Sequence, residues 1–477
     1  MSSLSSIQRR GAIPTYTSLT ATGFLDNYNP NEASSEALAS KIVSMPEFVV
    51  EYEETKDLGS IEEPKKVEEP QDDTAPQQNA TSEDIEEGKA AYRPGGFHPV
   101  YIGDIFNDRY EVLNKIGYGG YSTVWLVKDL QDNDDDDASN VYRALKVLRA
   151  NCYGHGTDTS EREILRCLRD GSRDHPGYPY VCHLIDDFEH QGPNGTHVCF
   201  IFELMGETLR SFGTWFPLDG MIPYEIMLRF AIQLVLALWY AHDHDVIHTD
   251  IKPNNIFVKF RDWSFIESGY LKEIPVPQQD REETEYRPVP SQPLRWFYFD
   301  YNAKYSADFD ITLGDWGVSS WTTRHLTEVI QPVLLRAPEV IIGAPWDAST
   351  DWWNFGAVLL EVFRTVRMFD GGVPPDGHYE IKEHLIEIID FFGPFPKKLL
   401  EKGNQDLVRD LFDDEGRIKD AEPLDRPGLM SETITPGMGQ TLREAFVSFM
   451  NLLMKIDPEE RPSALDLLRH PFLGAVQ

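Results

Sequence analysis

The spacing of apolar residues changes along the chain from a strand-like to a helix-like period. YEVLNKIG, STVWLVKDL and VYRALKVLR, which follow one another from residue 110, are short β-rich runs and predict three successive strands. Residues 160–169 have helical spacing, and two further strand-like runs lead to CFIFELM. Beyond that point we expect helices, the longest over 223–244, 348–366 and 381–392. A β-rich part followed by an α-rich part predicts an α+β protein of two lobes with a cleft between them.

The N-terminal stretch and one internal stretch lack this periodicity. Residues 1–97 are rich in Glu, Pro, Ser, Gln and Asn, which predicts a disordered acidic tail. The folded domain is expected over 98–475, with lobes of 98–204 and 205–475. The Pro- and charge-rich residues 260–309 interrupt the second lobe, and an insertion of that length is either functional or flexible.

Charge and cysteine content narrow the classes of partner. The formal net charge of −35 over 477 residues would repel phosphate, so we expect no direct nucleic-acid partner. The charge fits a cationic partner, and it fits equally a solvated acidic surface that aids solubility. The four cysteines form no C-x-x-C pair, which indicates a reducing, intracellular compartment. No apolar run reaches the length of a membrane span; Phe230–Ala241 is typical of a buried helix.

A short loop, VIHTDIKPNNIF, collects three kinds of polar group. Asp250 and Asn255 are five residues apart, with Lys252 between them. A carboxylate, an ammonium and an amide in one loop suit the joint binding of a hydroxyl, a magnesium ion and a phosphoryl group. The alternative is a polar turn in which Asp and Asn cap backbone groups, and other parts of the chain must decide between the two.

The first predicted turn between strands, IGYGGYSTVW, is rich in glycine. Gly117 and Gly119 match the first two glycines of G-x-G-x-x-G, and Ser122 occupies the third position. Glycines let backbone amides approach phosphate oxygens closely. The motif lies between two strands rather than between a strand and a helix, which argues against a dinucleotide-binding fingerprint.

Further elements for phosphate binding follow in a fixed order. Lys146 on a predicted strand can pair with phosphates, and we expect Glu163 at the start of the next helix to hold its flexible stem. Asp315 before Trp and Gly has the form of a metal-binding element. The sequence then supplies Ala-Pro-Glu ending at Glu339, together with two later polar positions, Asp351 and Arg461.

In this order the motifs resemble the eukaryotic protein kinases over residues 110–473, and the SR-protein kinases (SRPK) in particular. The stretches that carry the closer resemblance are GGFHPVYIGDIFNDRYEVLNKIGYGGYSTVWL, HTDIKPNN, HLTEVIQ, HLIEIIDFFG and RPSALDLLRHPFL. The fungal SRPK-like branch is the most similar. The resemblance implies a two-lobed protein kinase fold with a β-rich N-lobe and an α-rich C-lobe.

The same resemblance implies catalytic roles. Asp250 would accept or orient the proton of the substrate hydroxyl, and Lys252 would neutralise the transferring γ-phosphoryl group. Asn255 and Asp315 would hold Mg²⁺. A lysine two residues after the catalytic aspartate is typical of transfer to Ser or Thr rather than to Tyr.

The implied ATP site spans the glycine-rich turn, two strands, the helix after them and the hinge between the lobes. In this site Phe202 would be the gatekeeper, and the Glu203 carbonyl and the Met205 amide would bond adenine. The expected ATP-binding residues are Ile116, Gly117, Tyr118, Gly119, Gly120, Val124, Ala144, Lys146, Glu163, Phe202, Glu203 and Met205.

The implied substrates are basic, Arg/Ser-rich proteins of the splicing-factor kind, phosphorylated by a monomer in cytoplasm and nucleus. Glu383 and Asp390 in IKEHLIEIIDFFG resemble the family's acidic docking pair, and their spacing of seven residues places them close to one face of a helix. Two other classes remain as alternatives: a pseudokinase scaffold that binds partners without transfer, and a small-molecule phosphotransferase. The Ala-Pro-Glu element and the long helical lobe argue against the latter.

Three positions depart from common kinase patterns. Thr249 stands where many kinases have an arginine that a phosphorylated activation segment neutralises. Without that charge we expect an enzyme that needs no activation-segment phosphate. Pro332 and Leu335 stand where the family usually has Thr and Tyr. Both shape the substrate pocket, so the preference for Arg/Ser dipeptides stays open.

Overall fold

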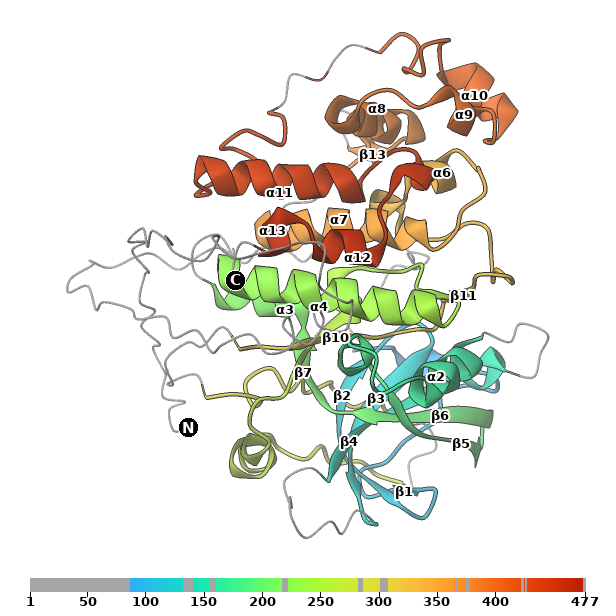
Figure 1. Ribbon diagram of the computed structural model, residues 1–477. Helices are drawn as coiled ribbons and strands as arrows, with labels where there is room; N and C mark the ends of the chain where they lie inside the picture. The colour runs from blue at the N-terminus through green and yellow to red at the C-terminus, as the bar shows by residue number, and fades with distance from the viewer. Residues whose placement is uncertain are drawn as a thin grey trace.

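The computed structural model describes most of the chain from residue 86 onward, arranged in two lobes (Figure 1). The described residues are 86–131, 141–153, 160–216, 222–281, 286–300, 308–364, 368–373, 377–421, 424 and 427–474. The predicted tail up to residue 85 and the acidic residues 132–140 lie outside these ranges. In Figure 1 the sheet-based N-lobe lies below and the helical C-lobe above.

The N-lobe is built on a six-stranded antiparallel sheet in the order β1-β2-β3-β4-β6-β5. Its strands are β1 (Ile105–Phe106), β2 (Tyr110–Tyr118), β3 (Ser122–Asp129), β4 (Tyr142–Leu148), β5 (Leu184–Gly192) and β6 (Gly195–Glu203). One helix of the lobe, α2 (Glu161–Asp170), lies beside β5. The three strands and the helix predicted from residue spacing are all present.

Alternation along β3 and β4 separates a core face from a face toward the cleft. Trp125 and Leu145 are fully buried and pack in one apolar cluster. Val124, opposite Lys146 in the register, is only partly buried. Because successive side chains of a strand point to opposite faces, Ala144 lies on the same face as Lys146.

The C-lobe is organised around α4 (Tyr224–Asp243), most of which is buried. By length and composition α4 could cross a membrane, yet 78% of its most apolar window is buried within the fold, as expected for a core helix. The other C-lobe helices are α3 (Leu209–Phe212), α5 (Leu271–Glu273), α6 (Pro338–Ile341), α7 (Ser349–Arg364), α8 (Ile381–Phe392), α9 (Lys397–Leu400), α10 (Gln405–Leu411), α11 (Gln440–Leu453), α12 (Ala464–Leu468) and α13 (Pro471–Gly474).

Short strands pair with one another within the C-lobe. They form three small sheets: β7 (Met205–Thr208) with β9 (Ile256–Lys259) and β10 (Ile311–Leu313), β8 (Val246–Ile247) with β11 (Ser320–Trp321), and β12 (Gly372–Val373) with β13 (His378–Tyr379). The HTDIKPNN loop runs from β8 to β9, and the segment with Asp315 runs from β10 to β11. The pairing β9–β10 therefore brings the two motifs together.

The folded domain begins earlier than the predicted boundary at residue 98. The Gly95 amide donates to the Asn194 carbonyl at 2.8 Å, the Asn194 side chain donates to the Phe97 carbonyl at 2.6 Å, and Phe97 is buried. Residues 86–97 thus pack on the sheet, although their polar composition resembles that of a tail. The composition was misleading because these residues are held mainly by backbone hydrogen bonds and isolated contacts.

The described parts of the 260–309 insertion are folded. Tyr270 and Phe297 pack with Leu204, which lies between the two lobes. Tyr298 covers Gly206 so closely that a side chain at this glycine would clash with its ring. The insertion therefore lies against the connection between the lobes and supports it.

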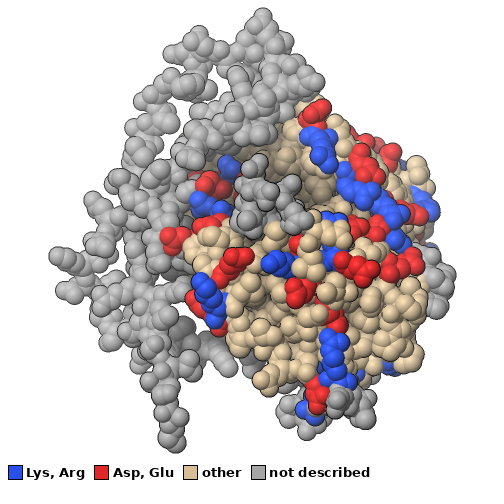
Figure 2. Space-filling view, turned by 90° about the horizontal axis from the view of Figure 1, so that it is seen from below, with Lys and Arg blue, Asp and Glu red and all other residues tan. Residues whose placement is uncertain are grey.

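Charges on the surface are mixed. Seen from the N-lobe end, acidic and basic side chains are interspersed over the described surface, with uncharged areas between them (Figure 2).

Three histidine rings meet at the N-lobe edge. His98 is buried, with its ring centroid 4.6 Å from that of His190 and 5.0 Å from that of His197. Burial, reinforced by the two neighbouring histidines, lowers the pKa of His98 from 6.5 to about 3. Folding therefore requires His98 in its neutral form.

This cluster predicts a loss of stability in mild acid. Below pH 6.5 the unfolded chain binds a proton at His98 that the folded chain excludes until about pH 3. The free energy of unfolding should therefore fall by up to about 1.4 kcal/mol per pH unit for this group alone as pH drops. Urea denaturation from pH 7 to 5 measures the slope, and His98→Gln should flatten it. An unchanged slope in the variant would contradict the assignment.

Candidate active site

The HTDIKPNN loop is folded around Asp250. The Asn255 amide nitrogen donates to the Asp250 carboxylate and to the Asp250 carbonyl, each at 2.8 Å. Lys252 Nζ lies 3.1 Å from the same carboxylate. Burial raises the pKa of Asp250, and the charge of Lys252 opposes this rise. The loop therefore presents one carboxylate beside one ammonium, which excludes a simple capping turn.

Asp351, at the start of α7, fixes the backbone in front of this loop. Its carboxylate accepts hydrogen bonds from the amides of His248, at 2.8 Å, and Thr249, at 3.0 Å, and is fully buried. Thr249 has φ of 64°, a conformation that β-branched residues rarely adopt. Its hydroxyl donates to the Val318 carbonyl at 2.9 Å. The strained turn is held because three polar contacts act on two adjacent residues.

Lys146 is the centre of the charged groups in the cleft. Its ammonium lies 2.6 Å from Glu161 Oε1 and 3.0 Å from Asp315 Oδ1. Burial alone would lower the pKa of Lys146, but the charges of Asp315 and Glu161 outweigh it and raise the pKa. The charge of Lys146 in turn lowers the pKa of Asp315. β4, α2 and the segment after β10 thus meet at one ammonium.

The prediction that Glu163 holds Lys146 was wrong. Glu163 is exposed and pairs with Arg324 at 2.9 Å, whereas Glu161 is buried and holds the lysine. Residues two apart lie on different faces of a helix. Glu161 is one turn before the buried Leu165, on the core side of α2. This apolar stripe was the signal in the sequence that could have identified the correct glutamate.

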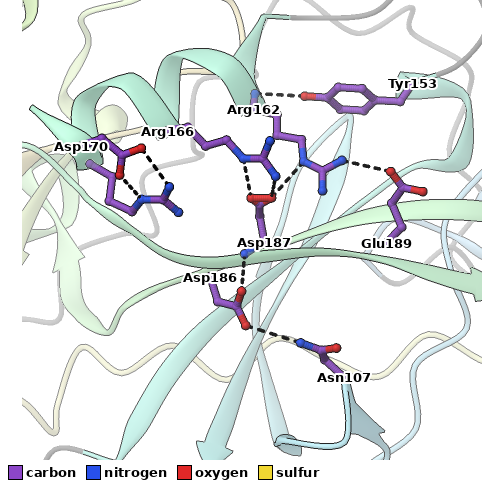
Figure 3. Close-up of polar contacts among 9 residues, drawn as sticks. Asn107, Tyr153, Arg162, Arg166, Asp170, Asp186, Asp187 and Glu189 are labelled. Atoms are coloured by element: carbon purple, nitrogen blue, oxygen red, sulfur yellow. Dashed lines mark hydrogen bonds and ion pairs between the residues drawn. The ribbon is translucent and has the colours of Figure 1, made fainter.

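Ion pairs attach α2 to the sheet. The buried Asp187 of β5 accepts hydrogen bonds from Arg162, at 3.0 Å, and from Arg166, at 2.9 Å (Figure 3). Arg162 also reaches Glu189 at 3.0 Å. The arginines are four residues apart on one helix face, so a single carboxylate receives both. The contact fixes the rotation of α2 and with it the position of Glu161.

The glycine-rich turn leaves room for a ligand. A side-chain carbon added at Gly117, Gly119 or Gly120 would meet no atom within 4 Å. The turn is held by its own backbone, with the Gly119 amide donating to the Ser122 carbonyl at 2.8 Å. Neighbouring protein atoms would therefore allow a side chain at these three positions. A phosphate group bound close to the backbone would exclude one, which is consistent with the presence of glycine.

The predicted adenine-site residues are brought together by strand register. Ala144 lies opposite Phe202 across β4 and β6, and β6 ends at Glu203. Met205 begins β7 after a one-residue step. Ile116 and Ala144 both pack against the apolar cluster that includes residues of the insertion. The assignment of adenine contacts to Glu203 and Met205 stays a prediction.

The donor set fits a divalent metal held partly by phosphate. Both hydrogens of the Asn255 amide are used on Asp250, so the amide oxygen is the atom left for a cation. The Asp315 side chain is 47% exposed to the cleft. Within the described ranges no cluster of three or more His, Cys, Asp or Glu side chains could hold a metal. Phosphate oxygens and water must supply the remaining ligands, as is usual for Mg²⁺ in phosphoryl transfer.

Deeper in the C-lobe, Glu339 and Arg461 form an ion pair. The guanidinium is bidentate to the carboxylate, at 2.6 and 2.8 Å, and both side chains are fully buried. Arg461 also lies over the Trp353 ring, 5.5 Å from its centroid. The pair ties the end of the activation segment to the C-terminal helices.

The two residues of the predicted docking pair on α8 lie in different surroundings. Asp390 borders a cavity of about 670 Å³ between α8 and residues 413–421 and 424, whereas Glu383 is not among its lining residues. The cavity has an apolar side formed by Ile386 and Ile389. Seven-residue spacing places two carboxylates near one face of a helix, but only Asp390 meets the segment that completes the groove.

Comparison with known proteins agrees with this geometry. The chain matches the family described as Protein kinase domain over residues 110–277 and 299–473. A serine/threonine protein kinase of Aspergillus fumigatus is 33% identical over 393 residues, covering 82% of this chain and 91% of that protein. The serine/threonine-protein kinase SRPK of Physarum polycephalum is 27% identical and covers 82% and 92%. A solved kinase domain superposes with a TM-score of 0.55 at 24% identity, covering 78% of this chain and 98% of that one.

The chain belongs to the protein kinase family, and its ATP- and metal-dependent chemistry is phosphotransfer. Within that family it is an SRPK-like serine/threonine protein kinase.

Glu161 and Glu163 provide a matched pair for testing the site. Glu161→Gln removes the charge that holds Lys146, and kcat/KM should fall by roughly 10²-fold or more, as when one preorganised electrostatic group is lost. Glu163→Gln breaks only an exposed ion pair, so its effect should stay within about threefold. Steady-state phosphotransfer with both purified variants measures this. Equal losses in the two variants would contradict the assignment of the lysine partner.

Proposed function

We propose that the protein is a constitutively active, Mg²⁺-dependent serine/threonine kinase for basic, Arg/Ser-rich proteins. Asp250 orients the substrate hydroxyl and takes its proton, while Lys252 neutralises charge on the transferring phosphoryl group. Lys146, held by Glu161, grips the nucleotide phosphates, and Asn255 with Asp315 hold Mg²⁺. The groups needed for transfer are present in one place, which supports an active enzyme over a pseudokinase scaffold.

The observation that carries the substrate class is the groove beside α8. Carboxylates of Asp390, Asp413 and Asp420 border it, around an apolar floor. Three of the charged lining groups are already engaged within the fold. Arg417 pairs with Glu415, Lys419 donates to the Arg409 carbonyl at 2.5 Å, and Asp413 accepts from the amides of Glu415 and Arg417, each at 2.9 Å. The groove thus offers negative charge to an arginine while its apolar wall receives the stem of the side chain.

The groove lies on the outer part of the C-lobe, where α8 is remote from the N-lobe (Figure 1). A substrate bound there must be long enough to reach Asp250 as well. An extended chain with many arginines meets this requirement, and the net charge of −35 favours its approach.

The groove predicts a difference between long and short substrates. Asp390→Lys should raise KM for a long Arg/Ser-rich protein several-fold, more strongly at low salt because the contact is ionic. A short Arg/Ser peptide that cannot reach α8 should be phosphorylated almost as before. Glu383→Lys, on the same helix but outside the groove lining, is the matched control and should change neither reaction. Equal losses on long and short substrates, or equal losses in the two variants, would exclude docking at Asp390; Asp250→Ala controls for contaminating kinases.

Constitutive activity is supported by how the activation segment is held. The Thr249 hydroxyl replaces an arginine and bonds the Val318 carbonyl directly. Pairing of β11 with β8 attaches the segment after Asp315 to the strand that precedes the catalytic loop. None of these contacts needs a phosphate.

Phosphatase treatment tests the proposal that the enzyme is constitutively active. The dephosphorylated enzyme should keep nearly all of its kcat, because no buried cation in the loop waits for a phosphate. Rates before and after treatment, with mass spectrometry to confirm removal, measure it. Loss of most activity, restored by a single activation-segment phosphate, would show that Thr249 does not have this consequence.

A further inference from the structure

Lys115, one residue before Ile116 and the glycine-rich turn, is fully buried in the N-lobe. A lysine is rarely buried unless its charge is paired, because removing an ammonium from water is costly. Its partners come from two segments that are distant in sequence from β2. We name this meeting point of β2, residues 86–92 and residues 286–292 the Lys115 junction.

The first partner segment precedes the predicted domain. The ammonium of Lys115 pairs with Glu87 and lies 3.5 Å from Glu86 Oε2. Glu87 is itself buried, and it accepts a hydrogen bond from the hydroxyl of Tyr92. Residues 86–92 are therefore held on the sheet by the charge of one lysine.

The second partner segment belongs to the insertion. The Val289 carbonyl accepts from Lys115 Nζ at 3.2 Å, and the Gln292 amide donates to the Lys115 carbonyl at 2.8 Å. The insertion also contacts the first segment, since Ser291 donates to the Glu86 carboxylate through its amide, at 2.8 Å, and its hydroxyl, at 2.7 Å. The rings of Tyr92 and Tyr286 pack with centroids 4.4 Å apart.

The number of hydrogen-bond acceptors at the Lys115 junction matches the number of donors of a lysine ammonium. An ammonium has three N–H donors, and three acceptors surround this one: Glu86, Glu87 and the Val289 carbonyl. The two carboxylates exceed the single positive charge by one, and they also accept hydrogen bonds from the hydroxyls of Tyr92 and Ser291. The contact is thus a complete polar network rather than an isolated pair.

The network continues into the turn that covers the phosphates. Lys115 Nζ lies 4.9 Å from the centroid of the Tyr118 ring, within cation–π range. The register of β2 against β3 shifts between Lys115 and Gly117, so the strand is irregular where the turn begins. Polar contacts at Lys115 therefore fix the base of a turn whose own glycines meet no protein atoms on the side-chain side.

Neither partner segment lies within the matched protein kinase domain, which starts at residue 110 and omits 278–298. We propose that residues 86–92 and the insertion act together through Lys115 as a positioning device for the glycine-rich turn, so that retention of the ATP phosphates depends on both. Lys115 and Glu87 are positioning residues: they touch no reacting atom and act through Ile116 to Tyr118. The proposal rests on the nucleotide site of the proposed kinase and goes beyond it by giving the insertion a role.

The test measures nucleotide binding and turnover separately in the full chain. Lys115→Met and Glu87→Gln should each raise KM for ATP and Kd for a non-hydrolysable ATP analogue by roughly fivefold or more, a typical size for coupling between sites. kcat at saturating ATP should change less than about threefold, because Lys146 and Asp250 are untouched. Binding of the analogue needs no protein substrate, so it stays informative if the Arg/Ser assignment fails.

Two further variants distinguish positioning from general loosening. Ser291→Ala removes one bond of the insertion to Glu86 without exposing a buried charge, and it should raise Kd for the analogue in the same direction to a smaller extent. Arg281→Gln breaks another contact of the insertion with the N-lobe, its 2.6 Å ion pair with Asp104, and should leave Kd unchanged. Thermal unfolding confirms that each variant is folded. An unchanged Kd in Lys115→Met and Ser291→Ala, or an equal rise in Arg281→Gln, would overturn the proposal.

Discussion

The ammonium of Lys146 is the point on which the two lobes and their chemistry depend. It draws a strand, a helix and the segment carrying Asp315 together through two carboxylates at 2.6 and 3.0 Å. A buried ion pair adds little net stability, because desolvation offsets much of the attraction. Removing only one partner of such a pair is costly, however, because the charge of the other partner is then buried and unpaired. Net stability therefore does not explain the arrangement, and Asp187 supports it by anchoring the helix of Glu161.

A second constraint concerns the catalytic loop. The loop has Thr249 in place of an arginine that would need an anionic partner. The Thr249 hydroxyl donates to a backbone carbonyl, and the Asp351 carboxylate accepts from two consecutive amides. These contacts are neutral or already satisfied within the fold, so the loop conformation does not depend on an added charge. Lys115 is likewise paired within the fold. Its partners come from segments outside the general kinase domain, and they complete a charged network beside the proposed nucleotide site.

Much of the site could be predicted because its motifs are local. Asp250, Lys252 and Asn255 lie within six residues, and loop geometry brings them together without help from distant elements. Glu163 was predicted wrongly because the choice between two glutamates depends on helix phase. That phase is set by packing against the sheet, where the stripe leading to Leu165 is buried. The predicted docking pair stays a prediction; the structure places Asp390 in the lining of the cavity beside α8 and Glu383 outside it.

The sequence by itself determined the two-lobed architecture, the order of the catalytic motifs and the family, because strand and helix periods and short motifs are written in neighbouring residues. Only the tertiary structure decided where the domain begins, which glutamate holds Lys146 and where the insertion packs. Residues 86–97 and the insertion look like tail and linker by composition, since few apolar residues mark them. Their order comes from backbone hydrogen bonds and from ion pairs to Lys115, contacts between positions up to about two hundred residues apart, such as Ser291 with Glu86. No local pattern can encode a partner at that distance, so this part of the protein is set by packing.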